Sequence, residues 1–121
     1  MSLSSPRKVI FDTDPGVDDA MALYYALAHP GVEMVGITTT FGNVSVDQAA
    51  VNALYLTAIA NQIVPVTKGV KSPWVKPGEA PPDFIHGSDG LGNLSARVAT
   101  TNAVDPRSSA QFIVEIGRAH V

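Results

Sequence analysis

The chain has 121 residues, a formal net charge of −3, 45% hydrophobic residues and 16% charged residues, which is typical of one compact domain and excludes a disordered chain. It has no cysteine, which excludes disulfides and thiolate zinc sites. Because its few lysines and arginines form no cluster, we expect no nucleic-acid partner.

The apolar pattern of the first 40 residues predicts a strand, a helix and a second strand. "KVIF" (Lys8–Phe11) is a short apolar run typical of a buried parallel strand. After "DPG", the segment "VDDAMALYYALA" has apolar residues at helical spacing, and Pro30 and Gly31 supply a stop signal. "VEMVGITTT" (Val32–Thr40) is rich in β-forming residues and predicts the second strand.

The same alternation continues once more and then stops. Ser45 and Gln48 have the spacing of a capping box, which predicts a second helix. "IVPVT" (Ile63–Thr67) predicts a third strand. Residues 68–106 have no apolar periodicity and are rich in proline and glycine, which favours a functional loop, and a last helix is expected from about Ser108.

This order of elements predicts an α/β fold, with a Rossmann-like, open, mainly parallel sheet and flanking helices. Such sheets bind ligands at the carboxyl edge of their strands. Three strands without closing elements would leave an unpaired edge, so the sheet looks incomplete.

The stretch "FDTDPGVDDA" concentrates four carboxylates, Asp12, Asp14, Asp18 and Asp19, after the first strand. Two unit charges about 4 Å apart repel by roughly 4 kcal/mol at an effective dielectric constant near 20. The helix dipole offsets only about 0.3–1 kcal/mol per group. A divalent cation would remove the repulsion, and oxygen ligands suit calcium or magnesium.

The helix geometry indicates that Asp18 and Asp19 have different roles. Asp18 and Asp19 are neighbours on a helix, so their side chains diverge by about 100°. We expect one of them to complete a metal site with Asp14 and the other to face a ligand. Asn43, at the end of the second strand, is expected beside Asp14, whereas Asp12 is expected to support the loop. Helix capping is the simpler alternative for any single acid here.

Three motifs resemble the nucleoside hydrolases, the calcium-dependent inosine/uridine-preferring N-ribohydrolases. They are "DTDPGVDDA", "ITTTFGN" and "HGSDGLGN", and their order and spacing agree over roughly residues 7–115. The resemblance implies that residues 1–121 form the N-terminal part of a single nucleoside hydrolase domain.

The resemblance also implies a reaction, the hydrolysis of the N-glycosidic bond of ribonucleosides to ribose and free nucleobase. By position, Asp14 would bind Ca²⁺ and act as general base on the attacking water, and Asp19 would be a second Ca²⁺ ligand. Asp18 would hold ribose hydroxyls and Asn43 would line the same pocket. His86 would lie on the nucleobase side and stabilise the leaving group.

The expected setting is purine or pyrimidine salvage by a cytoplasmic protein without membrane contact, and a homo-oligomer (dimer or tetramer) for the full-length protein. Members of the family are more than twice as long, and their second half supplies further calcium and ribose ligands. We therefore expect residues 1–121 alone to bind calcium weakly and to lack useful hydrolase activity.

The last six residues, Ile116–Val121 ("IGRAHV"), differ in character from the helical segment before them. They match the translation of a common sequencing-adapter read. We interpret residues 116–121 as a non-native tail, with an ordinary helix end as the alternative.

Two other functions fit part of the pattern. A haloacid-dehalogenase-like, magnesium-dependent phosphatase also has a D-x-D motif after its first strand, but here Pro15 and Gly16 replace the usual Gly-Thr. A non-catalytic calcium- or ribose-binding module is the third hypothesis. Phosphate-ester hydrolysis, or binding without turnover, would distinguish them.

Overall fold

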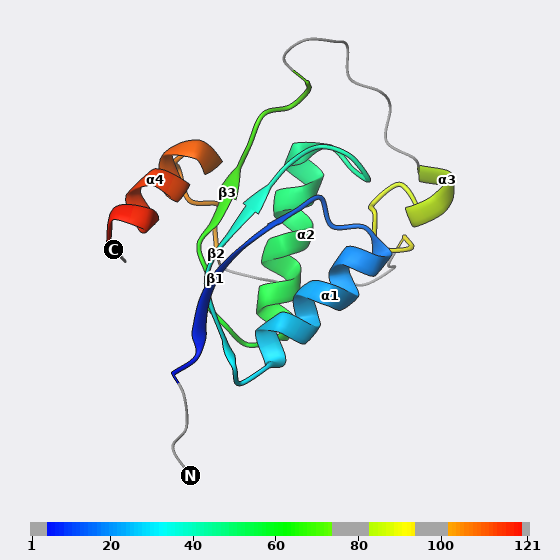
Figure 1. Ribbon diagram of the computed structural model, residues 1–121. Helices are drawn as coiled ribbons and strands as arrows, with labels where there is room; N and C mark the ends of the chain where they lie inside the picture. Colours follow the sequence, from blue (N-terminus) through cyan, green and yellow to red (C-terminus); the bar gives the residue numbers. More distant parts are fainter. Residues whose placement is uncertain (1–4, 74–82, 94–101, 120–121) are drawn as a thin grey trace.

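The computed structural model describes residues 5–73, 83–93 and 102–119. Strands and helices alternate in the first half of the chain, as the sequence predicts (Figure 1). In chain order, the elements are β1 (Arg7–Thr13), α1 (Val17–Ala28), β2 (Val32–Thr39), α2 (Val46–Ile59), β3 (Val66–Lys68), α3 (Asp83–His86) and α4 (Ser109–Ala119).

The three strands form one parallel sheet in the order β1-β2-β3. The register pairs Asp12 with Thr38 and Thr13 with Thr39, so β1 and β2 end side by side. Parallel neighbours need crossover connections, and α1 and α2 provide them. The predicted α/β class and parallel sheet are therefore confirmed.

The main core lies between the sheet and the helices α1 and α2, which cover the same face (Figure 1). Ile37 of β2 belongs to this core and is fully buried. The other buried members of the core are Leu23, Leu27, Ala50, Ala53, Leu54, Leu56, Val64 and Val66.

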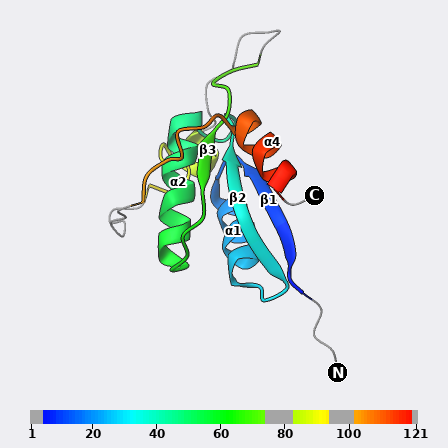
Figure 2. The same cartoon turned by 90° about the vertical axis from the view of Figure 1, so that its left-hand side faces the viewer.

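Helix α4 packs on the opposite face of the sheet (Figure 2). Phe112 of α4 is fully buried, and a side chain at Gly36 of β2 would collide with its ring. Since successive strand residues point to opposite faces, Gly36 faces α4 whereas Ile37 faces α1 and α2.

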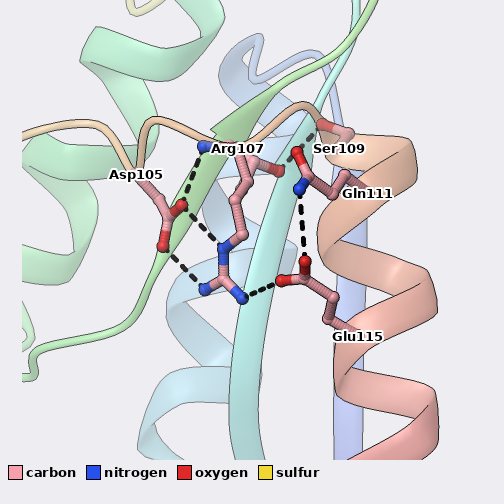
Figure 3. A network of polar contacts seen from close by, with 6 residues as sticks. Asp105, Arg107, Ser109, Gln111 and Glu115 are labelled. Atoms are coloured by element: carbon pink, nitrogen blue, oxygen red, sulfur yellow. Dashed lines mark hydrogen bonds and ion pairs between the residues drawn. The ribbon is translucent and has the colours of Figure 1, made fainter.

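The segment before α4 is fixed by an arginine (Figure 3). Arg107 donates to Asp105 through Nε (3.0 Å) and Nη2 (2.9 Å), and through Nη1 to Glu115 of α4 (2.7 Å). Its guanidinium also lies 4.9 Å from the centre of the Phe112 ring. These contacts tie the segment before α4 to the second turn of the helix.

Some boundaries differ from the sequence-based expectation. Strand β3 begins at Val66 rather than Ile63, because Ile63 is 88% exposed and the proline at 65 has no N–H for the ladder. Helix α4 continues through Gly117 to Ala119, so the change of character at Ile116 does not end it. No helix in the described part of the chain combines the length and the apolar character needed to cross a bilayer.

Candidate active site

Asp14 and Asn43 meet at the carboxyl edge of the sheet, as the sequence predicts. The backbone N–H of Asn43 donates to Asp14 Oδ2 over 2.7 Å, and its Nδ2 donates to the Asp14 carbonyl over 3.3 Å. A side chain at Gly42 would collide with the Asp14 carboxylate, so a glycine is needed there. The loops that follow β1 and β2 are thus joined through one carboxylate.

Asp19 lies beside Asp14. Burial raises the pKa of the Asp19 carboxyl, and the neighbouring Asp14 carboxyl raises that pKa further, whereas the hydroxyl of Thr13 lowers it. Thr13 Oγ1 donates to Asp19 Oδ2 over 3.1 Å. Two carboxyl groups held this close repel each other when both are ionised, and a bound cation would relieve the repulsion.

The other two acids of the stretch have different surroundings. Asp18 is exposed in the first turn of α1 and adds to the negative charge around Asp19. Asp12 accepts a hydrogen bond of 2.6 Å from Thr38 Oγ1 on the neighbouring strand. This contact fits the supporting role expected of Asp12.

The side chain of His86, the last residue of α3, contacts the turn between β1 and α1. Its Nδ1 accepts the backbone N–H of Val17 over 3.1 Å. Gly16, the N-cap residue of α1, offers no side-chain acceptor, so the imidazole satisfies one of the free N–H groups of the helix instead. A Cβ on Gly16 would lie 2.7 Å from His86 Nδ1 and 3.0 Å from Asn43 Nδ2, so the glycine lets both side chains converge there.

The loop after His86 is closed by its own side chains. Asp89 Oδ1 accepts the backbone N–H groups of Leu91 (2.9 Å) and Asn93 (2.7 Å). Asn93 Oδ1 in turn accepts the N–H of Ser88 over 2.8 Å. "HGSDGLGN" therefore encodes a compact turn that presents His86.

Sequence reasoning missed one residue that joins these loops, Asn52 of α2. Its Nδ2 donates to the carbonyls of Pro15 (3.1 Å) and Asp89 (2.8 Å). The available signal was an asparagine on the apolar face of a helix, in "AAVNALYL". An asparagine on such a face is buried, and a buried amide needs hydrogen-bond partners inside the protein.

Asp14 and Asp19 are suitable ligands for a hard cation such as calcium, which takes 6–8 oxygen ligands. Within residues 5–73, 83–93 and 102–119, no three His, Cys, Asp or Glu side chains are grouped to hold a metal ion. The pair thus fits part of a calcium site and needs further oxygen ligands.

The chain has a parallel α/β sheet with two neighbouring acids, an amide and an imidazole at its carboxyl edge, the edge at which proteins of the open α/β class bind ligands. The sequence model described as inosine-uridine preferring nucleoside hydrolase matches residues 9–121. The chain belongs to this nucleoside hydrolase family. The assignment removes the phosphatase hypothesis.

The similarity extends to curated relatives and solved structures. The chain is 47% identical over 112 residues to a probable uridine nucleosidase 2 of Oryza sativa subsp. japonica, covering 90% of this chain and 33% of the relative. It is 37% identical over 116 residues to the inosine-uridine preferring nucleoside hydrolase of Leishmania major, covering 95% and 37%. The purine-preferring ribonucleoside hydrolase from Gardnerella vaginalis superposes with a TM-score of 0.87 and 36% identity, over 94% of this chain and 37% of that structure. The chain thus spans about a third of the length of these proteins.

Proposed function

We propose that the protein hydrolyses the N-glycosidic bond of ribonucleosides and that residues 1–121 supply part of its active site. The observation that carries this proposal is the Asp14–Asp19 pair, with Asn43 bonded to Asp14. Family membership supports it, since the relatives are named as nucleosidases and nucleoside hydrolases.

The roles assigned to the acids follow their positions. Asp14 would take a proton from the attacking water as general base. Its contact with the Asn43 N–H fixes one carboxylate oxygen and leaves the other for a cation or water. Asp19 would be the second cation ligand, and exposed Asp18 would accept hydrogen bonds from ribose hydroxyls. Calcium, when bound, would orient a water and ease its deprotonation.

His86 is the candidate on the leaving-group side. Because its Nδ1 accepts the N–H of Val17, the neutral ring carries its proton on Nε2. That N–H could donate to the nucleobase as the bond from C1′ to the base nitrogen breaks. In the overall reaction, the water oxygen bonds to C1′, and the departing base nitrogen gains a proton.

The proposal includes a ribonucleoside substrate, Ca²⁺ as cofactor and a role in purine or pyrimidine salvage. A cytoplasmic location and a homo-oligomer remain predictions from the family resemblance. The non-catalytic binding hypothesis is an outcome of the experiment below.

The test uses the product of the whole reading frame, assayed for ribose release from inosine and uridine, with calcium binding measured by titration calorimetry. We expect Asp14→Asn to lower kcat by about 10³-fold or more, in line with the loss of a general base and metal ligand. Asp47→Asn is the control for loss of an aspartate charge, because Asp47 lies in the first turn of α2, is exposed and is paired with Lys68.

Full turnover by the Asp14→Asn variant would overturn the proposal. Calcium binding without ribose release in the unchanged protein would favour the binding module instead.

A further inference from the structure

Asn52 lies at the centre of α2 and is fully buried. Its side-chain amide has two N–H donors, and Nδ2 serves two backbone carbonyls, those of Pro15 and Asp89. Pro15 follows Asp14 directly, and Asp89 lies three positions after His86. One buried amide therefore joins the turn with the acid pair to the loop with the imidazole.

The carbonyl oxygen of the Asn52 side chain also has a hydrogen-bond partner. Gln48, one turn earlier on α2, donates from Nε2 to Asn52 Oδ1 over 2.9 Å. This contact orients the amide so that Nδ2 faces the two loops. The capping-box prediction for Gln48 is only half correct. Its backbone N–H does bond to Ser45 Oγ (3.2 Å), but its side chain contacts Asn52.

The loop after His86 packs closely against the Asn52 amide. At Gly90 the backbone has φ +80°, and a Cβ there would lie 3.0 Å from both Asn52 Nδ2 and the Pro15 carbonyl. A side chain at Gly90 would crowd this contact and would also collide with Val44. The separation of the two segments thus depends on Asn52 and on the absence of a side chain at Gly90.

We propose that Asn52 is a positioning residue, which holds the Asp14 turn and the His86 loop at a fixed separation so that both face one ligand. This inference rests on the proposed function, because it concerns the same site. Asn52 acts through backbone groups and does not itself contact the reacting atoms.

The experiment measures backbone amide exchange by mass spectrometry on the product of the whole reading frame, in EDTA. Asn52→Leu keeps the number and branching of the side-chain heavy atoms but removes both donors. We expect exchange to rise about tenfold in segments 15–19 and 86–93, as for loss of a buried hydrogen bond, with α2 and β2 still protected. Thr57→Val is the control, since Thr57 is equally buried on α2 but bonds only within its own helix in the contacts described here (to the Leu54 carbonyl, 2.9 Å).

Gln48→Ala keeps the proposal testable if Asn52→Leu does not fold. Gln48 is only half-buried, and its loss frees the orientation of the Asn52 amide, so we expect a smaller rise confined to the same two segments. Exchange in those segments that matches the Thr57→Val control in every folded variant would overturn the proposal. A rise spread evenly over the whole chain in Asn52→Leu, with none in Gln48→Ala, would also overturn it.

A kinetic readout separates this inference from the proposed function. If the protein hydrolyses nucleosides, we expect Asn52→Leu to lower kcat about tenfold with KM within about twofold of the original value, because positioning matters most in the transition state. If the protein hydrolyses no nucleoside, the exchange data still decide whether Asn52 positions the two loops.

Discussion

His86 Nδ1 accepts the backbone N–H of Val17 over 3.1 Å, although the two residues are 69 positions apart in sequence. The contact places the imidazole at the start of α1, within the turn that holds the acid pair. The candidate catalytic histidine is therefore also the cap of the helix that carries Asp18 and Asp19.

We predict that His86→Ala lowers kcat by about a hundredfold, at the lower end of what a general acid contributes. It should also cost about 1 kcal/mol of stability, since a helix cap is lost. Steady-state kinetics and urea unfolding test both effects. His29→Ala is the matched control, because His29 Nδ1 also accepts a backbone N–H (Gly31, 2.9 Å) but lies at the far end of α1. An unchanged kcat in His86→Ala would remove His86 from the mechanism.

Asp19→Asn should separate stability from metal binding. Without metal, the variant removes repulsion between Asp14 and Asp19, so we expect a higher melting temperature in EDTA. With calcium, the lost carboxylate should weaken affinity by about tenfold or more. Thermal melts in EDTA and in calcium measure the two effects. A lower melting temperature in EDTA would contradict the repulsion.

The contact between Asp105 and Arg107 predicts acid sensitivity in α4. Hydrogen bonds from Arg107 lower the pKa of the Asp105 carboxyl to about 2. Because the folded value lies below the ordinary value near 3.9, the contact stabilises above about pH 4 and is lost as pH falls toward 2. We expect amide exchange in α4 to increase over this range, and Asp105→Asn to show the fast exchange already at pH 6. Glu33→Gln, outside the network, is the control and should keep the acid transition of α4. The same transition in Asp105→Asn would contradict this assignment.

Gly36→Ala tests the packing of α4 on the sheet. The added methyl group would collide with the Phe112 ring, which costs about 1–3 kcal/mol as overpacking. Gly117→Ala is the control in the same helix, with no atom within 4 Å of the added carbon. We expect it to stabilise by about 0.5–1 kcal/mol. Urea unfolding of both variants gives the comparison, and an unchanged stability of Gly36→Ala would show that α4 is not held by this contact.

The sequence determined the alternation of strands and helices, the parallel sheet and the meeting of Asp14 with Asn43. These follow from local rules, namely apolar periodicity, the turn residues Pro15 and Gly16, and the side-by-side carboxyl ends of parallel strands. The nucleoside hydrolase family was also identifiable from the motifs alone.

The partner of each polar group, in contrast, depends on the three-dimensional packing. The Gln48 side chain bonds to Asn52 rather than to the Ser45 N–H, because a buried amide needs a protein partner, whereas water can serve a backbone N–H at the surface. His86 caps α1, and Asn52 joins two loops, because segments far apart in the chain bring their backbone groups to one place. Hydrogen bonding in a core is settled by three-dimensional proximity, and no local pattern in a single sequence contains that information.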